Sequence, residues 1–68
     1  MRYSIKIWND DDLIQEIELN TKKYCHKLRM EARKMCKWYE EYGQKDFTCI
    51  DLCKNGDAWI NLKTSLLK

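Results

Sequence analysis

One long helix is predicted for residues 21–42, which read TKKYCHKLRMEARKMCKWYEEY. Apolar side chains recur there at spacings of three, four and seven residues, as on the buried face of an amphipathic helix. We expect Asn20 or Thr21 to cap the start of this helix and Gly43 to end it. The stripe that the spacing places against the core is Tyr24, Cys25, Leu28, Ala32, Met35, Cys36, Tyr39 and Tyr42.

The charges of this helix oppose its own stability. Bases crowd its front and middle, Glu31 is the only acid among them, and Glu40 and Glu41 follow at the back. Acids near the N-terminus of a helix and bases near its C-terminus each stabilise it by roughly 0.3–1 kcal/mol. Because both ends are reversed here, we expect the basic surface to serve something other than folding. The bases are Lys22, Lys23, Lys27, Arg29, Arg33, Lys34 and Lys37.

A β-hairpin is predicted for residues 47–63, because Asn55-Gly56 separates two segments rich in strand-forming residues. Asn-Gly favours a two-residue turn, which pairs Lys54 with Asp57 and, further along, Leu52 with Trp59. We expect the helix to cover the face that carries Phe47, Cys49, Cys53, Ala58, Ile60 and Leu62, interrupted by Asp51. The outer face then carries Thr48, Ile50, Leu52, Trp59, Asn61 and Lys63.

A second hairpin is predicted for residues 3–19. Residues 2–8 alternate as a strand does, whereas LIQEIEL (13–19) fits both a strand and an extension of the helix. The strand is favoured, because a helix over residues 12–42 would be about 46 Å long, too long for so small a domain. A turn at residues 10–12 also pairs like with like and opposite charges. The pairs are Tyr3 with Leu19, Ile5 with Ile17, Ile7 with Gln15, Lys6 with Glu16 and Trp8 with Ile14.

The predicted fold is α+β, in the order ββαββ, with a four-stranded antiparallel sheet and one long helix packed on one face. The 68 residues are expected to form one domain, 1–68. A domain of this size buries only about 60% of the surface of its unfolded chain and leaves no room for a deep pocket of the several hundred cubic ångströms that a typical substrate needs. We therefore predict that the protein is not an enzyme. The tail TSLLK is expected to cover a sheet edge with Leu66 and Leu67.

The N-terminal residues and the hydropathy predict a cytoplasmic protein. MRYSIKIWNDDD lacks the apolar run and cleavage site of a signal peptide. No segment approaches the roughly 20 apolar residues of a membrane span, so we expect no membrane partner. In the cytoplasm the cysteines would be reduced thiols.

The spacing of the four cysteines argues against a zinc site or a disulfide. Cys25 and Cys36 would lie about 16 Å apart along a helix, and Cys49 and Cys53 about 13 Å apart along a strand. Neither pair can bind one ion or form a disulfide, although pairs of one helix and one strand cysteine stay open. We predict buried thiols, no metal and no cofactor.

The basic back of the helix is the first candidate contact surface. Its bases repel one another, because acids at spacing four are almost absent. Such a face suits phosphates or an acidic protein surface, and an exposed Met30 among the bases is more typical of a protein contact. Its residues are Lys23, Lys27, Met30, Arg33, Lys34 and Lys37.

The outer face of the sheet is the second candidate. One helix cannot cover both faces of a sheet, so this face would expose an apolar, tryptophan-bearing patch. Self-association is the simplest way to cover it, and tryptophan is a frequent interface anchor. Its residues are Trp8, Ile14, Ile50, Leu52 and Trp59.

The two surfaces together predict a small protein-binding regulator or inhibitor without catalysis. Domains of this size without a site are often carried by phages or mobile elements against a host protein. In this hypothesis the sheet face forms a homodimer and the basic helix binds a host or cellular protein with an acidic surface. The alternative is a nucleic-acid-binding protein that uses the same helix face, whose binding would weaken steeply with salt.

Overall fold

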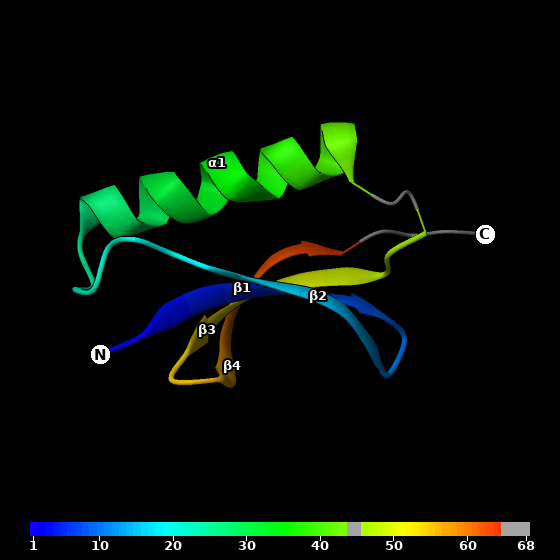
Figure 1. Ribbon diagram of the computed structural model, residues 1–68, viewed down its shortest axis with the longest axis horizontal. Coiled ribbons are helices and arrows are strands. Elements are labelled where there is room, and N and C mark those ends of the chain that lie inside the picture. Colours follow the sequence, from blue (N-terminus) through cyan, green and yellow to red (C-terminus); the bar gives the residue numbers. More distant parts are fainter. Residues whose placement is uncertain (44–45, 65–68) are drawn as a thin grey trace.

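A computed structural model describes residues 1–43 and 46–64, which form a four-stranded antiparallel sheet with one helix across it (Figure 1). The elements are β1 (Tyr3–Asn9), β2 (Asp12–Glu18), α1 (His26–Tyr42), β3 (Cys49–Lys54) and β4 (Asp57–Thr64). The strands lie in the order β2-β1-β3-β4, so β1 and β3 are central and β2 and β4 are edges. The predicted ββαββ fold is confirmed, and the segment that fitted both a strand and a helix forms β2.

The first hairpin has the predicted register over most of its length. Ile5 lies opposite Ile17 and Lys6 opposite Glu16. The pairing continues to Leu19, whose N–H donates to the Tyr3 carbonyl over 2.9 Å. The residues that pair β1 with β2 could therefore be read from the alternation of the sequence.

The turn of this hairpin is tighter than predicted. It consists of Asp10 and Asp11, and Asp10 has a φ of 54°, a left-handed conformation that a short polar side chain tolerates. A bulge between Ile7 and Trp8 reconciles the tighter turn with the rest of the register. Trp8 therefore lies opposite Leu13, and its predicted pairing with Ile14 is wrong.

The second hairpin keeps its predicted turn but loses its predicted register. Asn55 and Gly56 have positive φ angles of 52° and 89°, as a two-residue hairpin turn requires. Lys54 lies opposite Asp57 as predicted, but two bulges in β4 then shift the pairing. Leu52 consequently lies opposite Ile60, and the predicted pairing of Leu52 with Trp59 is wrong.

The face of β3 that lies under the helix is the opposite of the predicted one. Ile50 and Leu52 pair with Ile7 and Ile5 of β1, and all four side chains are buried in the core beneath α1. Cys49, Asp51 and Cys53 alternate with them and lie on the other side of the strand.

Burial of aliphatic surface explains this arrangement. A strictly alternating hairpin would put Ile60 and Leu62 on the side away from Ile50 and Leu52. The bulges let both pairs pack on the same core. Burying one such side chain stabilises a fold by about 1.5–3 kcal/mol, which exceeds the net 0.5–1.5 kcal/mol or so of a ladder hydrogen bond disturbed at a bulge.

The helix begins later than predicted and ends where predicted. Cys25 occupies the N-cap position without a side-chain hydrogen bond, so the prediction of Asn20 or Thr21 as cap is wrong. Gly43 ends the helix, and its N–H donates to the Tyr39 carbonyl over 2.8 Å. The first turn holds no acid and the last turn no base, so the predicted reversal of the end charges is confirmed.

The middle of the predicted helix stripe forms the core. Leu28, Ala32, Cys36 and Tyr39 are buried, and the Tyr39 ring packs edge-on against Phe47 at a centroid distance of 5.8 Å. The ends of the stripe are exposed instead. Those residues are Tyr24, Cys25 and Tyr42, of which the first two precede the helix.

Within residues 1–43 and 46–64, no helix has the length and apolar character needed to cross a membrane. The predicted cover of a sheet edge by Leu66 and Leu67 lies outside the described residues.

Candidate functional site

Glu31, the only acid among the bases of α1, is held by the segment that leads into the helix. Its carboxylate accepts the Asn20 N–H at 2.7 Å, the Thr21 N–H at 3.0 Å and the Thr21 hydroxyl at 2.7 Å. Burial raises the pKa of this carboxyl, but these hydrogen bonds and the nearby Lys27 ammonium outweigh it and hold the pKa below 4.5. The one acid available to neutralise the basic face is thus occupied by the backbone of residues 20 and 21.

The bases of α1 project into solvent and take part in none of the ion pairs among the described residues. In the part of the chain that the structure describes, the ion pairs are Arg2–Glu18, Lys22–Glu18 and Lys63–Glu40. None of these involves a base of the helix itself. The exposed bases of α1 are Lys27, Arg29, Arg33, Lys34 and Lys37.

The structure brings five of the six predicted contact residues onto the exposed surface of one helix. Those five are Lys27, Met30, Arg33, Lys34 and Lys37. Met30 is 56% exposed, which places a large apolar side chain among the bases as predicted. Lys23 is exposed too, but it lies before the helix because α1 begins only at His26.

The basic surface has two sides. Lys27, Met30 and Lys34 border a shallow hollow between the helix and the segment that precedes it. Arg29 borders a separate groove between α1 and β4, and Arg33 adjoins both hollows. A contact on one side of the helix can therefore be distinguished from a contact on the other by choosing the base that is changed.

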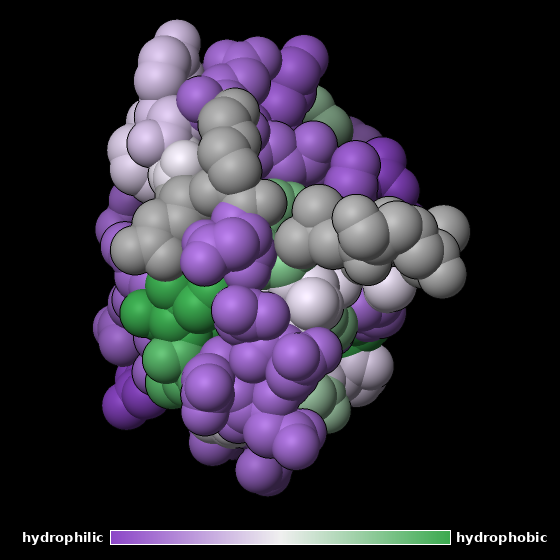
Figure 2. All heavy atoms as spheres, turned by 90° about the vertical axis from the view of Figure 1, so that its right-hand side faces the viewer, coloured by the Kyte–Doolittle hydropathy of each residue, from purple (hydrophilic) through white to green (hydrophobic). Residues whose placement is uncertain are grey.

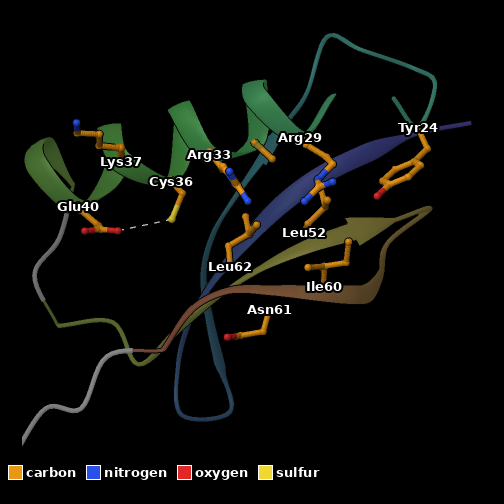
Figure 3. A pocket seen from close by; sticks show the side chains of 11 residues that line it. Tyr24, Arg29, Arg33, Cys36, Lys37, Glu40, Leu52, Ile60, Asn61 and Leu62 are labelled. Carbon is orange, nitrogen blue, oxygen red and sulfur yellow. Dashed lines mark hydrogen bonds between the residues drawn. The ribbon is translucent and has the colours of Figure 1, made fainter. Parts of the chain in front are cut away.

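The groove between α1 and β4 has a volume of about 610 Å³ (Figure 3). Its floor is aliphatic and comprises Leu52, Ile60 and Leu62. Figure 3 shows Arg29 and Arg33 reaching from the helix toward this floor. The volume is that of an open channel between the edge strand and the helix, so it does not contradict the expectation that so small a domain has no room for a deep pocket.

An aromatic cluster bounds one end of the groove. The Tyr24 ring stands edge-on to Trp59 at 4.8 Å, and Trp59 lies 6.1 Å from the Tyr3 ring. The Lys54 ammonium lies 5.6 Å from the centre of the Trp59 ring. Trp59 is the extra residue at the first bulge of β4, and its contacts with Tyr3 and Tyr24 place its ring on the helix side of the sheet.

The five residues predicted for self-association do not share a face. Ile50 and Leu52 are core residues with 0% and 1% exposure, and Ile14 packs against the same core. Trp59 contacts the aromatic cluster described above. Trp8, which is half-buried, alternates with the buried Ile7 and lies on the side away from the helix. The predicted outer patch is therefore wrong, because Ile50 and Leu52 lie on the face of β3 opposite to the predicted one.

The side of the sheet away from the helix carries polar groups. The Ser4 hydroxyl donates to Glu16 over 2.7 Å, the Lys6 ammonium donates to the Gly56 carbonyl over 2.6 Å, and Asp51 accepts the Asn61 amide at 3.1 Å. Figure 2 views the end of the molecule at the right of Figure 1, and its lower part, away from the helix, is mainly hydrophilic. This side is a polar network in place of an apolar patch.

The four cysteines are free thiols in different surroundings. Burial, together with the Glu40 carboxylate, raises the pKa of Cys36 to about 11. Burial and Asp51 do the same for Cys49, and burial raises the pKa of Cys53. Cys25 is exposed, so the prediction of buried thiols is wrong for that residue. Among the described residues, no cluster of three His, Cys, Asp or Glu side chains could hold a metal ion.

No protein-family model, curated protein or solved structure matches this chain. Its function is therefore inferred from its own surfaces.

Proposed function

We propose that the protein is a non-catalytic protein-binding regulator whose helix α1 docks on an acidic surface of a cellular partner, as an inhibitor of a host protein would. One observation carries the proposal, namely the row of exposed bases on α1 without ion pairs among the described residues. Like charges at spacing four destabilise a helix by about 0.2–0.5 kcal/mol per pair. An acidic partner surface would relieve this repulsion.

The apolar side chains between the bases favour a protein partner. Met30, Trp38 and Tyr42 are 56%, 45% and 72% exposed, and the Trp38 and Tyr42 rings lie 6.1 Å apart. Methionine, tryptophan, tyrosine and arginine are enriched in protein interfaces, and buried tryptophan and arginine supply much of the binding energy there. The exposed surface of α1 holds all four residue types.

Binding of single-stranded nucleic acid is the second candidate. Trp38 follows Lys34 and Lys37 on the helix, and bases stack on exposed aromatic rings beside cations. The exposed Glu41 lies between Trp38 and Tyr42 in the same helical turns, where it would repel a phosphate. The acid at this end of the helix makes a protein partner the better proposal.

The remaining parts of the proposal come from general features. Action in the cytoplasm and an origin in a phage or mobile element are part of the proposal, and the free cysteines and the small size of the chain are compatible with them. A homodimer would need a surface other than the five residues predicted for it, since Ile50 and Leu52 are core residues.

The test uses the immobilised chain in a nuclease-treated cell extract, with two single charge reversals compared. Lys34→Glu changes a base of the helix, and Arg2→Glu makes the same charge reversal at an exposed base before β1 as a matched control. We expect a captured partner to be lost with Lys34→Glu and kept with Arg2→Glu. Equal retention by both variants would contradict the proposal. A gel shift of an oligonucleotide at about 50 mM salt, weakening log-linearly as salt rises, would favour the second candidate instead.

A further inference from the structure

We propose that the groove between α1 and β4 binds an extended segment of the partner protein in which acidic residues alternate with apolar ones. This inference rests on the proposed function, because it names the part of the partner that the helix engages. It adds residues that the basic face does not include, above all Arg29 and the aliphatic floor of the groove.

Two arginines define the acidic positions of the segment. Arg29 and Arg33 are four residues apart in α1, hence about 6 Å apart along its axis, and both reach toward the groove floor (Figure 3). Alternate side chains of an extended chain point the same way and lie about 6.6–6.8 Å apart. Two carboxylates at alternate positions would therefore each meet one guanidinium, whose planar fork binds a carboxylate through two hydrogen bonds.

The floor defines the intervening positions. Ile60 and Leu62 are half-buried, and they line the groove across from the two arginines. The side chains of the segment that lie between its carboxylates point toward this floor, where apolar side chains would be buried from water. The floor suits apolar side chains better than a nucleic acid, because Leu52, Ile60 and Leu62 are aliphatic and offer no ring on which a base can stack. A fatty acid carries one carboxylate and would leave one guanidinium without a partner.

The charge of the groove changes along its length. At the end opposite Tyr24, the Glu40 carboxylate accepts a hydrogen bond from the Cys36 thiol at 3.7 Å and forms an ion pair with Lys63 at 3.4 Å. A further acid there would face this carboxylate. The two acidic positions of the segment consequently lie at the Arg29 and Arg33 half, and the segment continues with an uncharged residue toward Glu40.

The segment is held by side-chain contacts and not by backbone hydrogen bonds to the edge strand β4. β4 is an edge strand, and an unpaired edge is a common site for strand addition. Two bulges interrupt its ladder with β3, and bulged edges pair poorly with a further strand. Methylation of the backbone amides of the bound segment should therefore leave its affinity within about threefold.

The probe is a capped, fluorescent peptide of about seven residues in which two Glu alternate with Leu and the residues that follow are uncharged, a length that spans the distance from Arg29 past Arg33. Fluorescence anisotropy measures its binding to the parent chain and to Arg29→Glu, Lys34→Glu and Leu62→Gln. Lys34→Glu is the matched control, since it makes the same charge change on the other side of the helix. Far-UV circular dichroism checks that each variant is folded.

We expect Arg29→Glu to weaken binding by about tenfold or more, since a charge-assisted pair is lost, and Lys34→Glu to weaken it by at most about threefold. Replacing Leu by Ser in the peptide should weaken binding to the parent, and Leu62→Gln should remove that difference. Failure of the parent to bind the Glu-Leu peptide overturns the inference. Equal losses with Arg29→Glu and Lys34→Glu overturn it as well, because they indicate diffuse charge.

Competition by a single-stranded oligonucleotide that depends on Arg29 would also overturn the inference, since the groove would then be a phosphate site. Each of these failures is separate from a failure of the proposed function. If one of these groove tests fails and the cellular partner is nevertheless lost with Lys34→Glu, the proposed function stands and the helix binds protein without using the groove.

Discussion

Replacing Glu31 by Ala should lower the free energy of unfolding by about 1.5–3 kcal/mol at neutral pH. The carboxylate accepts three hydrogen bonds from Asn20 and Thr21. A hydrogen bond to a charged group contributes about 1.5–3 kcal/mol when buried. Glu31 is half-buried and water competes for its oxygens, so we assign about 0.5–1 kcal/mol to each bond. For a domain of this size the loss corresponds to a fall in Tm of roughly 6–24 °C.

The effect of Glu31→Ala should depend on pH with a definite sign. The folded pKa of Glu31 lies below its ordinary value of 4.5, so the ionised form stabilises the fold. This contribution is complete above the unfolded pKa and is lost as the pH falls through the folded pKa. The difference between parent and variant should therefore shrink steadily below about pH 4.5.

Urea denaturation followed by circular dichroism at pH 7 and near pH 3 measures both quantities. Glu31→Gln is the matched control, because it keeps the shape and one acceptor oxygen but carries no charge. We expect it to lose less than the Ala variant and to show a weaker dependence on pH. A loss below about 0.5 kcal/mol at pH 7, or an equal loss at both pH values, would refute the assignment of Glu31 as the anchor of residues 20 and 21.

Three further results are expected. Gly43→Ala should destabilise the fold by about 1–3 kcal/mol in urea denaturation, because the new Cβ would lie 2.5 Å from the Tyr39 ring; a gain in stability would show that the ring moves freely. Tyr39→Phe should keep or raise stability by up to about 1 kcal/mol, because the buried hydroxyl has no hydrogen-bond partner among the described residues; a clear loss in the same assay would contradict this. Iodoacetamide at pH 8 should modify the exposed Cys25 first. Cys36 and Cys49, whose pKa is about 11, should react roughly 100-fold more slowly than an ordinary thiol. Peptide mapping by mass spectrometry measures these rates, and equal rates would disprove the raised pKa of Cys36 and Cys49.

The local signals of the sequence are sufficient for the element order, for the Asn55-Gly56 turn and for the position, but not the length, of the first turn. Asn55-Gly56 forms a turn with positive φ at both residues, and the alternation around Ile5 and Ile17 predicts their pairing. These features depend on neighbours within a few residues. A sequence pattern reports such neighbours directly, so the ββαββ order could be derived without any long-range information.

Strict alternation along β4 does not predict the bulges, because each bulge adds one residue that breaks the alternation. Trp59, Ile60 and Leu62 cannot all lie on one side of a regular strand, yet all three are large and apolar. A bulge in β4 allows all three side chains to lie on the helix side of the sheet. Asp51 was a second unused signal, since the face of β3 that carries an acid is the poorer choice for the core. Ile50 and Leu52 alternate with it and are buried.

The start of the helix depends on a contact that no local pattern shows. The apolar spacing extends the stripe back to Tyr24 and Cys25, but the chain before His26 is not helical. Glu31 holds Asn20 and Thr21 from within the helix, about one and a half turns after its start. Because the partners are ten or eleven residues apart in the sequence, capping rules based on adjacent residues assigned them the wrong role.

The candidate groove has the same origin as the errors in register. The basic residues of α1 could be listed from the sequence, but a basic helix alone offers only a convex, diffuse surface. The bulges of β4 turn Ile60 and Leu62 toward the helix, and this gives Arg29 and Arg33 an apolar floor to face. The same bulges weaken β4 as an edge for strand addition. The bulges therefore have two effects. They make β4 a poor template for a further strand, and they form the surface that can bind a segment with alternating acidic and apolar side chains.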